Sequence, residues 1–497
     1  MKHVDTPQSV CRFAVARRDI TPPVGIYHRM WGAAAHDRSE GIHRPLTATA
    51  MVFAPATLGD AHARGAASAG SAGRQILIAL DHCLLRPQEM RRFIERVCAA
   101  ASVKEDELLV TFSHTHGAGL METDRADLPG GEMIAPYLES MAMHAAEAVS
   151  EAAANLQEAT ITFTTGRCQL AAHRDLWDER LRAFVCGYHP GGPVDGAVLV
   201  GRVTGSEENH LATIVNYACH PTTLAWGNRL ISPDYPGAMR EVVEQATGAP
   251  CVFLQGACGD VGPVEGFVGD VEVADRNGRQ LGFAALSALE AMPPSRTRFE
   301  YAGPVVSGAT IGTWEHRPLD GGELAAKARW TLRRWTIDLA YRPGLPTADE
   351  TRRKLADWTA KEQSARRAGH TAAAADARAM AERMTRQLTR LRQQPPGETF
   401  PYDVTLWRIG DAFWLAVAGE PYNLLQRALR EKFPGVALVV IELAGGWGPS
   451  YLPPADVYGQ DLYQQNIAIV APGSLERVID ESARQIQAWL EMASAAP

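Results

Sequence analysis

Two histidines separated by one residue stand directly after a short apolar run, and side chains of this type suit a divalent metal ion. His114 and His116 follow the run Glu107–Phe112, whose composition predicts a buried β-strand. Continued alternation along that strand predicts that both imidazoles point to the same side. Neutral imidazole nitrogens bind zinc or support a developing negative charge, and such rings seldom serve packing because their nitrogens need polar partners. The motif therefore indicates a metal site or a catalytic site at the end of a strand.

Three further side chains with metal-binding or catalytic chemistry also follow predicted strands. His220 ends the run 212–219 and precedes a proline, which cannot continue a strand ladder. Glu420 comes just after the run 413–417, and Tyr451 follows the run 437–443. Taken alone, His220 is equally consistent with an ordinary loop position, and for Glu420 and Tyr451 a loop position is the favoured interpretation. Because ligands gather at strand ends in α/β proteins, we expect the three to converge with His114 on one ion.

Apolar runs of strand length alternate with amphipathic helical stretches through most of the chain. This order predicts an α/β fold, in which a mixed β-sheet core is flanked by helices and carries a helical insertion. The expected strands cover residues 75–80, 108–112, 160–164, 197–203, 211–217, 250–254, 403–409, 412–417 and 436–443. The expected helices cover residues 86–102, 132–156, 236–247, 272–292 and 422–433, with Gly248 stopping the third of them.

The segment 322–394 differs from the rest, because it is rich in Ala, Arg, Glu and Gln with apolar residues at helical spacing. We interpret residues 322–397 as an inserted helical hairpin, on a main domain made of residues 1–321 and 398–497. Acidic residues are interspersed among its arginines, which favours a solvated helical face over a nucleic-acid surface. A second unusual stretch, 59–73, is rich in Gly, Ser and Ala and predicts a flexible hairpin loop.

Bulk properties exclude several classes of function. The chain has 497 residues, 46% of them hydrophobic, and a formal net charge of −8, which leaves no basic footprint for nucleic acid. No apolar run approaches the ~18 residues of a membrane span, and the N-terminal residues lack the apolar core of a secretion signal. Eight cysteines occur without a Cys-X-X-Cys pair, so we expect reduced core residues and a cytoplasmic protein. Cys219 and Cys258 lie near the candidate site, but packing is the favoured role for both.

Several motifs together resemble the catalytic domain of the neutral/alkaline, non-lysosomal ceramidase family. They are Thr115-His116 with its flanks, Asn216–His220, Gln255–Asp260, Tyr451–Pro454, the opening Asp19–Pro22 and Gly41–His43. No single motif is specific, but their combination is, and the similarity extends over roughly residues 12–300 and 400–475.

The resemblance implies a zinc site and an amide-cleaving reaction. Carried over by motif, the zinc ligands are His114, His220, Glu420 and Tyr451. His116 then stands beside the metal as a proton donor or oxyanion partner. Arg174 matches a site arginine, and Tyr463 matches an oxyanion-stabilising tyrosine. The implied reaction is hydrolysis by water that zinc activates.

The sequence departs from this family in two respects. Gly262 stands where the ceramidases place a serine that is proposed as nucleophile, so we expect direct attack by zinc-bound hydroxide. His116 or Asp260 would then handle protons, although Asp260 could instead fix the glycine-rich turn. The second departure is the lack of the family's C-terminal β-sandwich and secretion signal, which puts a sphingolipid substrate in doubt.

The leading prediction is a zinc-dependent amidohydrolase that cleaves an N-acyl or other small-molecule amide. An esterase or lactonase on the same zinc site is the close alternative. Two alternatives from other classes are a non-catalytic binding protein on a degenerate hydrolase scaffold and an interaction protein built around the arginine-rich insertion. The insertion also offers a possible homo-oligomer face, and no nucleic-acid partner is expected.

Overall fold

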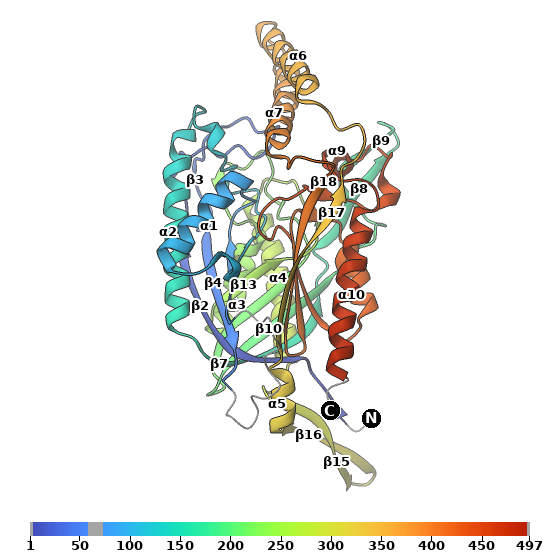
Figure 1. Cartoon of the computed structure of the whole chain (residues 1–497). Coiled ribbons are helices and arrows are strands. Elements are labelled where there is room, and N and C mark those ends of the chain that lie inside the picture. Colours follow the sequence, from blue (N-terminus) through green and yellow to red (C-terminus); the bar gives the residue numbers. More distant parts are fainter. Residues whose placement is uncertain (1–2, 58–72, 495–497) are drawn as a thin grey trace.

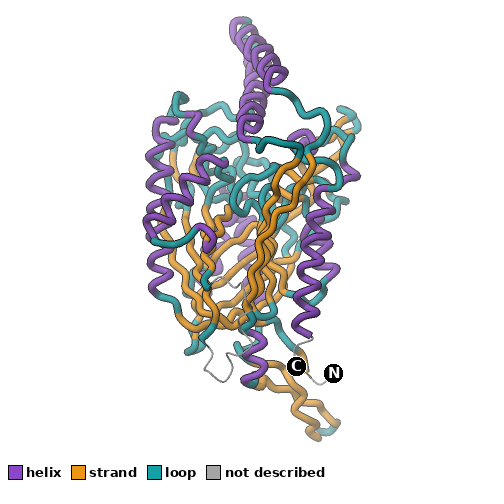
Figure 2. The backbone as a smooth tube through the Cα atoms, in the orientation of Figure 1, coloured by secondary structure: helices purple, strands orange, loops and turns teal. Residues whose placement is uncertain are grey.

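The computed structural model describes residues 3–57 and 73–494, which are arranged in four layers (Figure 1). Two β-sheets pack face to face in the middle, and helices cover the outer face of each sheet, as the backbone trace shows (Figure 2). The α/β class with a mixed sheet core and flanking helices is therefore confirmed. Residues 58–72 of the glycine- and serine-rich stretch lie outside the described residues.

In the described residues, eight strands form the larger sheet. Its spatial order is β13-β11-β10-β7-β2-β4-β5-β6, antiparallel throughout except for the parallel pairs β11–β13 and β5–β6. The strands are β2 (Gln8–Asp19), β4 (Thr47–Pro55), β5 (Gln75–Leu80), β6 (Leu108–Phe112), β7 (Gln157–Arg167), β10 (Ala197–Gly205), β11 (His210–Tyr217) and β13 (Cys251–Gln255).

The smaller sheet has the order β17-β18-β19-β21 and lies on the inner face of the larger one. Its strands are β17 (Trp330–Ala340), β18 (Thr399–Ile409), β19 (Ala412–Val417) and β21 (Ala437–Ile441). A dry layer of aromatic side chains fills the space between the sheets. Phe53 and Phe163 of the larger sheet meet Trp407 and Trp414 of the smaller one, with ring centroids 4.8 Å apart for Phe53 and Trp407.

Two sets of helices cover the outer faces of the sheets. The larger sheet is covered by α1 (Pro87–Ala101), α2 (Ile134–Ala154), α3 (Tyr235–Thr247) and α4 (Val271–Glu290). The smaller sheet is covered by α8 (Leu424–Lys432) and α10 (Ser474–Ser494), with the short α5 (Gly321–Lys327) and α9 (Tyr463–Ile467) nearby in the chain. Gly248 ends α3 in the left-handed conformation, as predicted. None of the described helices is long and apolar enough to cross a membrane.

Among the described residues, the remaining strands form four additional sheets at the ends of the sandwich. They are β1 (His3–Val4) with β15 (Thr297–Val306) and β16 (Thr310–Pro318); β3 (Gly41–Ile42) with β12 (Leu230–Ile231); β8 (Ala171–Asp178) with β9 (Ala183–His189) and β14 (Val261–Pro263); and β20 (Glu420–Pro421) with β22 (Tyr451–Leu452). The hairpin β15–β16 projects from one end of the molecule (Figure 1).

The two edges of the larger sheet approach each other where the segment after β21 joins them. β6 and β13 are the outermost strands of that sheet, yet they contact one another. The backbone N–H of Glu442 donates to Gln255 O at the end of β13 (3.1 Å), and that of Gly445 donates to Val110 O in β6 (2.9 Å). The loops that follow β6, β11 and β21 therefore meet in one place.

The predicted helical insertion is wrong in one part, because a strand lies between the short helix α5 and the helical hairpin. Residues 330–340 form β17 and pair with β18 along the full length of both strands, from Trp330↔Ile409 to Ala340↔Thr399. Tryptophan, threonine and isoleucine favour strands, and Trp330 and Ile337 are buried in the sheet. The hairpin proper consists of α6 (Ala348–Arg367) and α7 (Thr371–Gln393), which stand out from the body (Figure 1).

The aromatic layer between the sheets generates a stability prediction. Trp414 is buried there against Phe53, Phe163 and Trp407. We expect Trp414→Ala to lower the free energy of unfolding by about 3–5 kcal/mol, because it leaves a large cavity in the packed layer. Trp314→Ala is the matched control, since Trp314 is 40% exposed on the projecting hairpin. Guanidinium unfolding of both variants measures the difference, and equal losses would contradict this account of the core.

Candidate metal centre

Three buried side chains from distant parts of the chain bring their ligand atoms together. The ligand atoms of His114, His220 and Glu420 all lie within 4.8 Å of one another. Glu420 Oε2 is 3.1 Å from His220 Nε2 and 3.5 Å from His114 Nε2. Two imidazoles and one carboxylate at this spacing are a donor set that suits zinc.

The backbone fixes both imidazoles in the orientation that a metal ligand needs. His114 Nδ1 lies 3.1 Å from Cys83 O, and His220 Nδ1 lies 2.7 Å from Cys258 O. A carbonyl can only accept, so each Nδ1 carries a proton, and each Nε2 is directed toward Glu420. His114 Nε2 is buried, and it has no hydrogen-bond partner among the described residues. Such an unsatisfied nitrogen is costly unless an ion occupies the space in front of it.

Electrostatics favour the protonation states that bind a cation. Burial, together with Arg174 and His114, lowers the pKa of His220 to about 3, so this ring is neutral at pH 7. Burial opposes ionisation of Glu420, but the two histidines hold the pKa of its carboxyl well below the usual range. The cluster therefore combines the neutral imidazole of His220 and the ionised carboxylate of Glu420 with the ring of His114.

The position of His114 has a different cause from the predicted one. β6 ends at Phe112, so the strand alternation does not reach the two histidines. His114 instead adopts a left-handed backbone conformation with φ 66°, and its N–H donates to His82 O at 2.9 Å. The rings of His114 and His116 still lie close, with centroids 5.1 Å apart, because the chain turns here.

Glu420 and Tyr451 are direct neighbours in the two-residue parallel pair β20–β22. They are register partners, and Glu420 N donates to Ser450 O at 2.8 Å. Gly419 precedes them with φ 70°, and a Cβ there would stand 2.5 Å from Ser450 O, so only glycine fits. The Tyr451 ring is stacked near His220, with centroids 6.5 Å apart. This pairing places the predicted fourth ligand beside the other three.

Arg174 and Tyr463 both lie next to Tyr451. The Arg174 guanidinium is buried and donates from Nη2 to Gly259 O (2.6 Å) and to Tyr451 Oη (3.3 Å). Burial and Glu420 raise the pKa of the Tyr451 phenol well above its usual value, and the Arg174 cation opposes that shift. Tyr463 begins α9, is 47% exposed, and has its ring centroid 5.9 Å from that of Tyr451. Its hydroxyl can therefore reach a substrate from the solvent side.

His116 lies beside His114 and His220, and aromatic side chains cover its other side. Its Nε2 is buried without a hydrogen-bond partner among the described residues, and burial lowers its pKa well below the usual value. Trp31 covers the ring at a centroid distance of 4.9 Å and is itself packed against Trp226 and Phe267. A neutral histidine in this position can accept a proton from a reacting group.

Asp260 makes its side-chain contacts with Asn423 and His173. Its Oδ1 accepts from Asn423 N at 2.6 Å, and its Oδ2 lies 3.4 Å from His173 Nε2. Burial raises the pKa of its carboxyl to about 7. These contacts join Asp260 to the start of α8 and to β8, so both roles expected for Asp260 stay predictions. Gly262 lies in β14, where a Cβ would meet only Thr222 Oγ1, at 3.6 Å.

A second possible donor group shares His114 with the first one. Cys83, His114 and His116 also lie within 4.8 Å of one another. Burial and the nearby Glu420 raise the pKa of the Cys83 thiol well above its usual value, which disfavours the thiolate that binds metals. We therefore favour the group that contains His220 and Glu420.

Sequence reasoning missed two residues that hold these ligands in place. Trp447 donates from Nε1 to Glu420 Oε1 at 2.5 Å. The buried Glu442 accepts from Cys258 N and Cys258 Sγ, both at 2.9 Å, and Cys258 in turn lies behind His220. The sequence signal for Glu442 was a carboxylate directly after the apolar strand β21. Burial raises the thiol pKa of Cys258 well above its usual value, which argues against a nucleophilic role.

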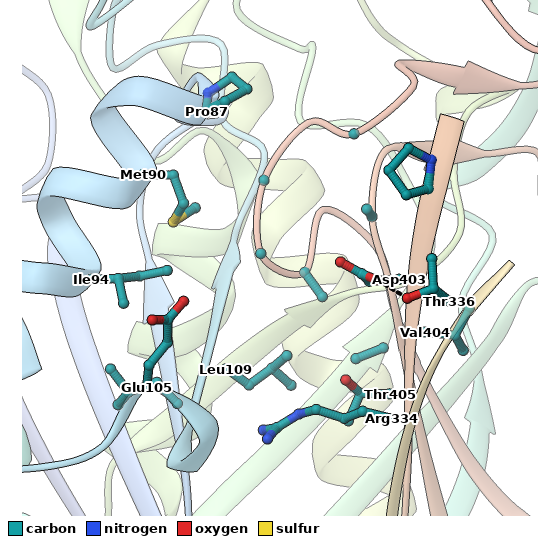
Figure 3. A pocket seen from close by; sticks show the side chains of 18 of the residues that line it. Pro87, Met90, Ile94, Glu105, Leu109, Arg334, Thr336, Asp403, Val404 and Thr405 are labelled. Atoms are coloured by element: carbon teal, nitrogen blue, oxygen red, sulfur yellow. Dashed lines mark hydrogen bonds between the residues drawn. The ribbon is translucent and has the colours of Figure 1, made fainter. Parts of the chain in front are cut away.

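A cavity of about 820 Å³ lies on the other side of the loop that carries Trp447 (Figure 3). Met90 and Ile94 of α1 line one wall, and Thr336 and Asp403 of β17 and β18 line the opposite wall. Trp447 borders this cavity as well, whereas the four candidate ligands do not line it. The indole therefore separates the cavity from Glu420.

Comparisons with solved structures show a shared fold. The crystal structure of the neutral ceramidase from Pseudomonas aeruginosa aligns with 97% of this chain and 74% of its own, with a TM-score of 0.61 and 16% identity. A structure described as ceramidase complexed with C2 aligns with 96% of this chain and 74% of its own, with a TM-score of 0.60 and 15% identity. No protein-family model and no curated protein matches the sequence. The chain thus has the fold of these ceramidase structures.

Proposed function

We propose that this protein is a zinc-dependent hydrolase that cleaves the C–N bond of a small-molecule amide. The observation that supports the proposal most strongly is the buried group of His114, His220 and Glu420, with Tyr451 paired beside it. A bound zinc ion would polarise the amide carbonyl and lower the pKa of water at the site. The shared fold adds an independent reason, because the structures that align with this chain are those of ceramidases, which are amide-cleaving enzymes.

The surrounding side chains supply the functions that amide hydrolysis requires. His116 is neutral and lacks a hydrogen-bond partner at Nε2, so it accepts a proton and then donates it to the leaving nitrogen. The exposed hydroxyl of Tyr463 donates a hydrogen bond to the carbonyl oxygen as negative charge develops there. Arg174 holds the Tyr451 oxygen in place. No serine is needed at position 262 in this scheme.

The metal site is tested by metal content. We expect about one zinc per chain in the purified protein and little in His220→Ala, because that variant removes one of the four ligands. His144→Ala is the matched control, since His144 lies in α2 outside the site. Inductively coupled plasma mass spectrometry measures the ratio. Wild-type protein that holds no zinc after reloading would refute the proposed centre.

The role of His116 is tested separately from the metal. We expect His116→Gln to lower kcat on an amide substrate by about 10²–10⁴-fold, the range typical of a lost general acid–base group, while zinc content stays at the wild-type level. Single-turnover kinetics on N-acyl amides and on the matched esters identifies the bond that is cleaved. Wild-type-like turnover in the variant would exclude His116 as the proton carrier, and cleavage of esters alone would replace the amidase by an esterase.

A further inference from the structure

A stripe of charged residues along α7 faces the body of the protein. Arg378, Glu382, Arg386 and Arg390 are four residues apart and therefore share one face of the helix. Arg378 pairs with Asp37 at 2.6 Å, and Arg386 donates to Met30 O at 2.7 Å. These contacts dock the helix and bring its C-terminal turn, with Arg390, toward the candidate metal centre.

Arg390 differs from the other charged residues of the stripe because it lacks a carboxylate partner. Within the described ranges it forms no ion pair, its Nη2 donates only to Gln387 of its own helix, and its Nε is buried without a partner. Its guanidinium carbon lies 5.7 Å from the centroid of the Trp447 ring, and the same indole donates to Glu420. One indole ring therefore separates Arg390 from a candidate metal ligand.

The charges around Arg390 do not balance. Glu122 accepts from Arg86 (2.5 Å) and Arg125 (3.0 Å), while Glu382 pairs with Arg125 (2.9 Å) and Arg386 (2.7 Å). Two carboxylates thus serve three guanidinium groups, and Arg390 adds a fourth. Burial and the nearby Arg86 lower the pKa of Arg390 to about 9, which is the direction expected for an uncompensated cation.

We propose that Arg390 binds an anionic group of the substrate, a carboxylate or a phosphate, so that the amide cleaved at the metal centre is an acidic amide. This inference rests on the proposed function and names its substrate class. An anion at this position neutralises the excess positive charge and fills the hydrogen-bonding capacity of a guanidinium, whose planar fork suits both groups. The Trp447 face beneath Arg390 and the exposed Tyr463 nearby provide the contacts that orient such a substrate.

Three amides of similar length test the inference. N-octanoylglycine carries a carboxylate, N-octanoyl-O-phosphoethanolamine carries a phosphate, and N-octanoylethanolamine is neutral. The variants are Arg390→Gln, Arg390→Lys, and Arg367→Gln as a control that makes the same charge change at an exposed position on α6. Turnover is measured with zinc-loaded protein, and affinity is measured by calorimetry with metal-stripped protein.

We expect the wild-type chain to prefer one of the acidic amides, and the better one identifies the group. Arg390→Gln should lower affinity and kcat/KM for that amide by roughly 10- to 100-fold, the loss typical of a charged hydrogen bond, and change the neutral amide by less than about threefold. Arg390→Lys should lose less affinity and less kcat/KM, because it keeps the positive charge but not the planar guanidinium. If Arg390→Gln does not fold, the comparison of Arg390→Lys with wild type decides the test. Arg367→Gln should behave as wild type.

Equal effects on acidic and neutral amides, or no wild-type preference for an acidic one, would overturn the inference. Arg390-independent cleavage of every amide would leave the proposed function intact and remove only this subsite. Binding of an acidic amide that depends on Arg390, without cleavage of any amide or ester, would keep the subsite at Arg390 and refute the proposed hydrolysis.

Discussion

The carboxylate of Glu420, buried beside the imidazoles of His114 and His220, is the constraint on which the arrangement of the site depends. A charge removed from water is strongly destabilising unless partners surround it. Here Trp447 donates to one carboxylate oxygen, while His114 and His220 lie within 3.5 Å of the other, and each of the three comes from a different part of the chain. Three segments that are distant in sequence must therefore close correctly before the carboxylate is satisfied. A cation in the group would add the largest remaining stabilising interaction.

The sheets make this convergence possible through their edges. A wide, nearly flat sheet would keep β6 and β13 far apart, but here the two edge strands contact each other, and the segment after β21 bonds to both. Because that segment continues into Trp447 and then Tyr451, the same backbone that joins the sheet edges also delivers side chains to the site. Fold stability and site geometry are thus linked through the loop 442–451.

Sequence reasoning identified much of the site but not the means of its assembly. His114, His220 and Glu420 come together as expected, because each of them follows a strand that the sequence predicted. The strand β6 nevertheless ends before the His-X-His motif. Contacts that depend on three-dimensional closure left no local signal, as for Trp447 on Glu420 or Arg390 on Trp447. The strand β17 was missed for a related reason. Its arginines resemble those of the following helices, and only pairing with β18 determines its conformation.

The parallel pair of Glu420 and Tyr451 has a consequence for how this site tolerates change. The two side chains sit opposite one another on strands of only two residues each, and thirty residues of chain lie between them. A slip of one position in that pairing would turn one of the two side chains to the other face, so the register fixes the two ligand candidates relative to each other. Insertions between residues 422 and 450 are therefore compatible with the site only if they restore the same register. Transfer of this centre to another scaffold therefore requires that Glu420, Tyr451 and Gly419 are moved together in the same register.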